Sequence, residues 1–227
     1  ESLNLAKLAV KINKTNEKLW LTLAEAQVAN KLYKKALTSL NKAQKINSNF
    51  SAIYFVKSDI YIKISQLQNA KSALEAGLKI DSDNYNAFFQ LGNILLMEKN
   101  YTEAIKFFEK SLQIKPDFWQ AINNKGLAYF EKNDKNLSTK LFEQAISIEA
   151  NAEPLLGLAT CLRTKDIKLA LELTKKALVK DPNYVLYEYR KKQLWGDKLQ
   201  ASAEILLKND QLKTDVILAK SKINTSS

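Results

Sequence analysis

The chain has 227 residues, of which 46% are hydrophobic, an ordinary share for a folded protein that excludes extensive disorder. It contains no histidine and one cysteine, Cys161, which excludes an intramolecular disulfide, a histidine-based catalytic triad and a zinc site built on these residue types. The net charge of +11 indicates either an anionic partner, such as nucleic acid or an acidic membrane surface, or the lysine enrichment typical of an AT-rich genome.

The first predicted element is a helix in residues 1–14. Its Ala9 begins a series of small residues at a constant interval of 34 positions, which continues with Ala43, Gly77, Ser111 and Ala145. A fixed interval of this length predicts a solenoid of repeated helix pairs. The pattern in residues 1–14 matches the second helix of such a pair. We therefore expect the chain to start inside a truncated repeat, with a signal peptide, a membrane anchor or more repeats upstream.

Four complete units are predicted next, in residues 17–50, 51–84, 85–118 and 119–151. In the third of them, Phe88 and Leu95 share one face of a first helix, and a second amphipathic helix follows in residues 101–114. Pro116 ends this unit because proline cannot continue a helix. Glycine inside a helix costs about 1 kcal/mol relative to alanine. We therefore expect Gly92 to lie where a larger side chain would collide.

A fifth unit, in residues 152–183, keeps the small and leucine positions but lacks the aromatic ones. After Pro182 the 34-residue pattern stops, and residues 184–227 are predicted to form capping helices and a short flexible tail. Terminal units of solenoids differ from the others because one side faces water. The alternative for this segment, which ends in an amphipathic stretch at 212–223, is a docking or dimerising element.

Bulky and small residues recur at fixed places in the first helices. The bulky series is Trp20, Tyr54, Phe88 and Ile122, and the small series is Ala24, Ser58, Gly92 and Gly126. Together with the alanines, aromatics and proline of the second helices, this pattern resembles the tetratricopeptide repeat over about four-fifths of the chain. The resemblance implies an all-α, right-handed superhelical solenoid of antiparallel helix pairs with a C-terminal capping helical segment. It also implies a non-catalytic scaffold or adaptor without a cofactor or metal.

The stretch Leu194-Trp195-Gly196-Asp197 is loosely similar to the ends of repeat proteins from cyanobacteria and chloroplasts, some of which assist the assembly of photosynthetic complexes. This similarity implies an assembly factor in the cytoplasm or at the thylakoid membrane. No apolar run in the chain is long enough to cross a bilayer, so a membrane location would depend on a segment upstream of Glu1.

In the tetratricopeptide repeat family, the first helix of each unit lines a concave groove. The family register implies a first row of groove side chains at Leu21, Phe55, Phe89, Asn123, Leu156 and Tyr189. It implies a second row, one helical turn further on, at Glu25, Asp59, Asn93, Leu127 and Thr160. We expect these rows to bind a peptide or helix of another protein, with Phe55 and Phe89 as exposed anchors. The alternative is that the two rings pack against neighbouring helices.

Glu25 and Asp59 are the only candidates for acid–base chemistry or metal binding. They lie on equivalent helices of adjacent units, whose axes are roughly 8–10 Å apart, whereas carboxylates that share a proton are about 3 Å apart. We therefore expect solvated groove acids that meet a basic or amide-bearing peptide. A carboxylate clamp for chaperone tails, which the family builds from lysine, arginine and asparagine, is not expected, because only Asn93 and Asn124 match it.

Lysines gather on the second helices, for example Lys34, Lys42, Lys106 and Lys175, and make the convex face basic. The main interpretation is a solvated face that keeps the solenoid soluble. The alternatives are peripheral contact with an anionic membrane and binding of RNA. RNA binding is the second functional hypothesis, but the apolar members of the first row offer few hydrogen bonds to bases.

Overall fold

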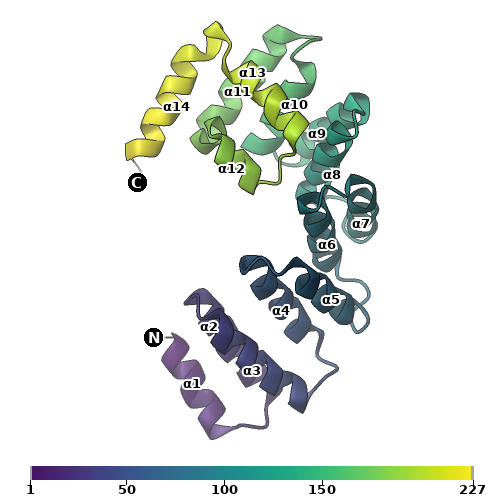
Figure 1. Ribbon diagram of the computed structural model, residues 1–227, viewed down its shortest axis with the longest axis vertical. Coiled ribbons are helices and arrows are strands. Elements are labelled where there is room, and N and C mark those ends of the chain that lie inside the picture. The colour runs from purple at the N-terminus through teal and green to yellow at the C-terminus, as the bar shows by residue number, and fades with distance from the viewer. Residues whose placement is uncertain (1, 226–227) are drawn as a thin grey trace. The chain divides into compact units, whose positions relative to one another are not determined.

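The computed structural model describes residues 2–225, in which every regular element is helical. The chain forms two compact units, one ending at Gln90 and the other beginning at Leu91 (Figure 1). The first unit contains α1 (Ser2–Ile12), α2 (Glu17–Ala29), α3 (Tyr33–Ile46), α4 (Ser51–Lys63), α5 (Leu67–Leu78) and the start of α6 (Tyr85–Met97).

The second unit begins with the rest of α6 and contains ten further helical elements among the described residues. These are α7 (Tyr101–Ile114), α8 (Trp119–Glu131), α9 (Lys135–Ile148), α10 (Ala152–Leu162), α11 (Ile167–Lys180), the 3-10 helix η1 (Pro182–Val185), α12 (Tyr187–Lys192), α13 (Asp197–Leu207), the 3-10 helix η2 (Asp210–Leu212) and α14 (Lys213–Thr225). The predicted all-α solenoid of helix pairs is confirmed. No helix in residues 2–225 is both long enough and apolar enough to span a membrane.

The turn inside each of the first four helix pairs has the same backbone geometry without a glycine. Lys31, Ser65, Lys99 and Asn133 each follow a first helix and have φ values of 57° to 66°. In the first of these turns, the N–H of Lys31 donates to the carbonyl of Val28, and the next N–H donates to the carbonyl of Gln27, both at 2.8 Å. These bonds satisfy carbonyls at the helix end, so the chain reverses within a few residues.

Glycines lie where an aromatic ring covers the helix backbone. A Cβ atom added to Gly92 would lie 2.5 Å from Cε1 of Phe108, a side chain with no exposed surface. A Cβ atom added to Gly126 would lie 3.1 Å from Cε1 of Phe142, and one added to Gly157 would lie 2.7 Å from the same atom. The side chain of Phe142 is also fully buried. The close approach of these backbones to the rings fixes the spacing of the helices.

Replacing Gly92 with Ala is expected to lower the free energy of unfolding by about 1–2 kcal/mol, because overpacking against Phe108 outweighs the gain in helix propensity. Gly126→Ala is the matched control. Its added Cβ atom would meet Phe142 at 3.1 Å, so the ring has to shift only slightly and little net change is expected. Urea unfolding followed by circular dichroism measures both variants. Equal stability of the two would contradict the packing argument.

The segment from η1 to α14, here called the C-terminal cap, packs on the last two helix pairs. Helix α13 packs against α8 and α10, and α14 packs against α11 and η1. Trp195, Leu199 and Ala203 of the cap are buried in one hydrophobic core with Leu127 and Leu156 of the pairs. The cap therefore lies on the first helices that were predicted to line the groove.

Candidate partner-binding groove

The C-terminal cap covers the groove positions of α8 and α10. Asn123, Leu127, Leu156 and Thr160 have at most 2% of their surface exposed, because α13 packs on both of their helices. The prediction that these side chains point into an open groove is therefore wrong. The physical reason is that Leu127 and Leu156 bury their apolar surface against the cap instead of leaving it for a partner.

Glu131 holds the N-terminus of α13 on the end of α8. Its carboxylate accepts hydrogen bonds from the backbone N–H of Leu199 at 2.9 Å and of Lys198 at 3.3 Å. An acidic group at a helix N-terminus is stabilised by the free N–H groups and by the helix dipole. Gly196 makes this approach possible, because a Cβ atom at that position would lie 2.3 Å from Cδ of Glu131.

Glu153, in the first turn of α10, makes a second polar contact with the cap. Its Oε1 accepts a 2.9 Å hydrogen bond from Nε1 of Trp195. Burial raises the pKa of Glu153 to about 7, although hydrogen bonds from Trp195, Asn123 and Tyr184 lower it. A carboxyl group with this pKa is partly protonated at neutral pH.

Asn93 of the second row is part of a chain of hydrogen-bonded amides, in which Asn93 is partly buried and Asn123 and Asn124 are buried. Its Oδ1 accepts a 2.8 Å hydrogen bond from Nδ2 of Asn124, and Oδ1 of Asn124 accepts a 3.0 Å bond from Nδ2 of Asn123. Oδ1 of Asn123 is buried without a hydrogen-bond partner. These amides hydrogen-bond to one another and join α6 to α8. The asparagines therefore have a structural role at these positions, because buried polar groups require hydrogen-bond partners.

Tyr189 belongs to the C-terminal cap and does not continue the first row. Its hydroxyl donates a 2.7 Å hydrogen bond to Oδ2 of Asp181, and its ring lies edge-on to that of Tyr184 with the centroids 5.1 Å apart. Burial and the hydrogen bond to Asp181 raise the pKa of Tyr189 to about 12. The family register fails here because α12 does not occupy the place of a first helix.

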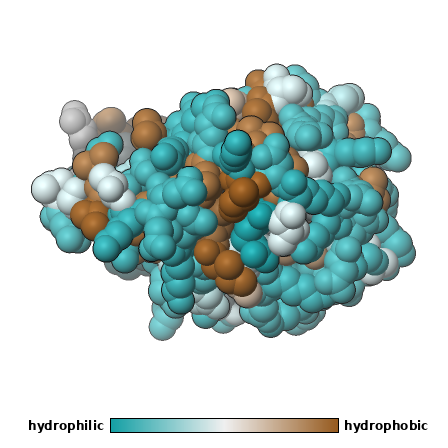
Figure 2. Space-filling view, turned by 90° about the horizontal axis from the view of Figure 1, so that it is seen from above, coloured by the Kyte–Doolittle hydropathy of each residue, from teal (hydrophilic) through white to brown (hydrophobic). Residues whose placement is uncertain are grey.

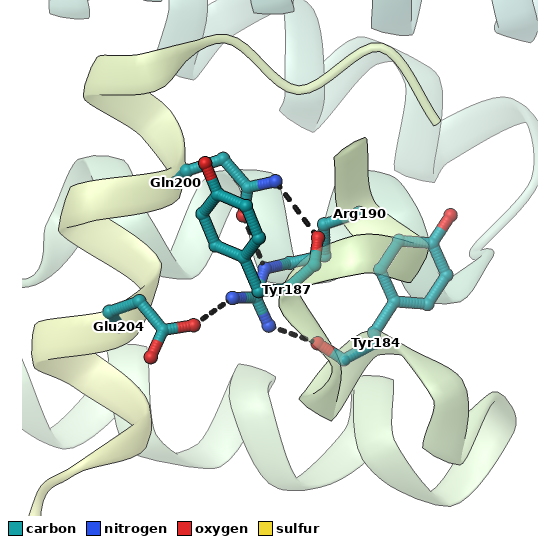
Figure 3. Close-up of polar contacts among 5 residues, drawn as sticks. All are labelled: Tyr184, Tyr187, Arg190, Gln200 and Glu204. Atoms are coloured by element: carbon teal, nitrogen blue, oxygen red, sulfur yellow. Dashed lines mark hydrogen bonds and ion pairs between the residues drawn. The ribbon is translucent and has the colours of Figure 1, made fainter. Parts of the chain in front are cut away.

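Arg190 is a fully buried cation at the centre of the cap (Figure 3). Its Nε donates to Oε1 of Gln200 at 2.8 Å, and its Nη1 donates to the carbonyl of Tyr184 at 2.6 Å. Nη2 forms an ion pair with Glu204 of α13. The amide of Gln200 in turn donates to the carbonyl of Tyr187 at 3.1 Å, so the guanidinium ties η1, α12 and α13 together.

The first unit has a small open pocket between α4 and α6. Its volume is about 70 Å³, and it is lined by Phe55, Asp59, Leu74, Asn84, Asn86, Ala87 and Gln90. Phe55, Leu74 and Ala87 supply an apolar wall, and the other side chains are polar. Oδ1 of Asp59 accepts a 2.8 Å hydrogen bond from Nε2 of Gln90, which joins α4 to α6 beside the pocket.

The acids predicted for the groove lie in different environments. Burial raises the pKa of Asp59, although the hydrogen bond from Gln90 and the charge of Lys63 lower it. Glu25 is exposed on α2. No three His, Cys, Asp or Glu side chains within the described part of the chain are placed to hold a metal ion. A partly desolvated carboxylate such as Asp59 is stabilised when a ligand brings a cation or an N–H group to it.

Phe55 packs against the second helix of its own pair. A Cβ atom added to Gly77 would lie 2.4 Å from Cε1 of the Phe55 ring. Phe55 therefore follows the alternative expectation, in which the ring packs against a neighbouring helix, although the ring also lines the pocket. Leu21 is only 8% exposed and belongs to the core of the first unit. Phe89 is partly buried on α6.

Asn86, Ala87 and Gln90 line the pocket but were not predicted from the sequence. The family register points to position 89 of α6, whereas the pocket is bordered by the neighbouring face of that helix. The spacing of Asn86 and Gln90 by four positions, on a helix with many apolar residues, was the available signal.

Comparisons with known proteins support this architecture. Sequence models of the tetratricopeptide repeat match residues 17–50, 51–84, 85–118 and 120–151. No curated protein sequence matches the chain. The crystal structure of MamA is similar with a TM-score of 0.60 and 25% identity, over 65% of this chain and 86% of that one.

Two further solved structures share the fold at lower identity. YrrB, described as a TPR protein with an unusual peptide-binding site, has a TM-score of 0.64 and 18% identity, over 82% of this chain and 97% of its own. PilF of Pseudomonas aeruginosa has a TM-score of 0.63 and 15% identity, over 91% and 97%. The family matches cover more than half of the chain, and they coincide with the observed helix pairs. The chain therefore belongs to the tetratricopeptide repeat family.

Proposed function

We propose that the chain is a non-catalytic scaffold that binds a peptide or helical segment of another protein at the pocket between α4 and α6. Membership of the tetratricopeptide repeat family suggests a protein-interaction scaffold. The observation that carries the proposal is the combination, in one pocket, of an apolar wall at Phe55 and Leu74 with the polar groups of Asp59 and Gln90.

The size of the pocket favours a polypeptide ligand. Sites for small molecules and cofactors are clefts of about 300–1,000 Å³. A pocket of about 70 Å³ lies well below this range, so it holds one side chain of a larger ligand rather than a whole small molecule. A peptide that places one such side chain in the pocket extends along the neighbouring helices for the rest of its contacts.

The charge of the pocket favours a basic or amide-bearing ligand. Asp59 gains most from a lysine, arginine or backbone N–H group, and the exposed Glu25 lies on the preceding first helix. YrrB is described as having a peptide-binding site, and its shared fold supports the same class of ligand here. A chaperone-tail clamp is not part of the proposal, because Asn93 and Asn124 bond to each other.

The 194–197 stretch does not extend the proposal to photosynthetic assembly. Trp195 donates to Glu153, and Gly196 allows the approach of Glu131, so both residues have structural roles in the cap. RNA binding, the second hypothesis, has no specific observation in its favour.

Asp59→Asn is expected to weaken the binding of basic peptides tenfold or more, because a charge-assisted hydrogen bond contributes about 1.5–3 kcal/mol. Asn keeps the shape of the side chain and the oxygen that accepts from Gln90, so the melting temperature should change little. Binding to an array of random peptides, followed by titration of the selected ones, measures the effect.

Glu75→Gln is the matched control, because it removes an exposed acid from α5 of the same unit. Selected peptides should retain their affinity for this variant. Loss of affinity in the control, or equal affinity of Asp59→Asn and the parent chain, would refute binding at this pocket.

A further inference from the structure

The net charge of the second unit is concentrated on two helices. Helices α11 and α14 contain seven lysines and two acidic residues. The rest of residues 91–227 contains 15 basic and 15 acidic residues and is therefore balanced. Within the second unit the lysine excess is therefore local to these two helices.

Large apolar side chains are exposed among these lysines. Val179 of α11 is 70% exposed, and Ile217 and Leu218 of α14 are 59% and 52% exposed. The two helices pack against each other, and Val179 and Leu218 line one shallow hollow of about 20 Å³ together with Lys175. Figure 2 shows one face of the molecule, where hydrophobic side chains lie among hydrophilic ones. Lys175, Lys222, Val179 and Leu218 thus border one hollow, and together with the other exposed residues of α11 and α14 they are here called the α11–α14 surface.

The two acids of the α11–α14 surface pair with lysines of the same surface. Glu172 lies 2.7 Å from Nζ of Lys176, and Asp215 lies 3.8 Å from Nζ of Lys175. Lys168, Lys180, Lys213 and Lys220 are exposed on the same two helices, with no further acid on either. The surface therefore presents a positive field that an anionic partner would neutralise.

We propose that the α11–α14 surface docks on an anionic lipid bilayer, with the lysines at the headgroups and Val179, Ile217 and Leu218 in the interfacial layer. Lysine is a compact point charge that suits a field of lipid headgroups. Neither helix contains an arginine for bidentate phosphate recognition or an aromatic side chain for base stacking, which disfavours RNA. The hollow is too small for the buried anchor of a protein partner.

The test is co-sedimentation of the whole chain with vesicles of phosphatidylcholine alone or mixed with phosphatidylserine. We expect binding to the mixed vesicles only, and binding that weakens as salt is raised because salt screens exposed charges. The combined variant Lys180→Gln, Lys213→Gln and Lys220→Gln is expected to lower the partition constant about 100-fold, at about fivefold per lysine.

A second variant keeps the charge and removes the apolar groups: Val179→Ser, Ile217→Ser and Leu218→Ser. It is also expected to lose most of the binding, because insertion and charge act together. The matched control replaces Lys34, Lys35 and Lys45 of α3 with Gln and should bind like the parent chain. Equal loss in the control, or full binding by the serine variant, would overturn the proposal in favour of general charge attraction. Binding to an RNA homopolymer without binding to any vesicle would overturn it in favour of nucleic acid.

Discussion

Replacing Arg190 with Met is expected to lower the free energy of unfolding by about 3 kcal/mol, because the guanidinium is the common partner of three groups in the cap. Met fills much of the space of the arginine but leaves Oε1 of Gln200 and the carbonyl of Tyr184 without their donor. Glu204 also loses its ion pair (Figure 3). Buried acceptors without partners are costly in a medium that contains little water.

Urea unfolding and the binding of a hydrophobic dye measure this effect. Loosening of the cap should expose Leu127 and Leu156, so the variant should bind more dye below its unfolding transition. Lys191→Met is the control, because it introduces the same side chain at the next, exposed position of α12. If both variants unfold at the same urea concentration, the Arg190 network does not hold the cap in place.

The stability of the chain is expected to fall as the pH rises through about 7. Glu153 has an ordinary pKa of 4.5 and a folded-state pKa of about 7, so the folded chain retains a proton that the unfolded chain releases. Its stabilising contribution is therefore fully present below about pH 4.5 and is lost as the pH rises through 7. The difference between the two pKa values corresponds to roughly 3 kcal/mol in the free energy of unfolding.

The absence of histidine from the sequence makes this prediction specific, since histidine is the usual group that titrates between pH 5 and 8. Glu153→Gln keeps an acceptor for Nε1 of Trp195 and removes the titration, so its stability should be nearly constant across this range. Glu149→Gln changes an exposed acid nearby and should leave the pH profile of the parent chain intact. Urea unfolding midpoints of the parent chain, Glu153→Gln and Glu149→Gln, measured between pH 5 and 8, test whether Glu153 causes the loss of stability. A profile of Glu153→Gln that still falls near pH 7 would show that another group is responsible.

The helix pairs could be predicted from the sequence because their determinants are local and periodic. Gly92 and Phe108 lie within one unit, and their contact follows from the approach of two helices joined by a short turn. Phe55 was expected to be an exposed anchor, with packing against a neighbouring helix as the alternative, although the small-residue series contained the signal for its contact. Position 77 is glycine where most other units have alanine or serine, and that glycine accommodates the ring.

The covering of α8 and α10 could not be predicted in the same way. The residues that cover them follow dozens of positions later, in a segment without the 34-residue interval, and no local rule states where such a segment will pack. Glu131 and Glu153 are acids that a hydrophobic pattern treats as solvated. Both acids instead accept hydrogen bonds from the cap: Glu131 from a backbone N–H of α13 and Glu153 from Nε1 of Trp195. These donors lie far away in the sequence, so no local pattern indicates the contacts.

The packing of η1 and α14 on α11 also limits how this architecture can grow. Repeat arrays lengthen by duplication, and isolated ends of such arrays can stack on one another into open fibres. Both processes require a free side on the second helix of the last pair, where the first helix of a further unit would pack. On this chain that flank of α11 already carries η1 and α14, so further units can be added within the array but not beyond α11 without displacing them.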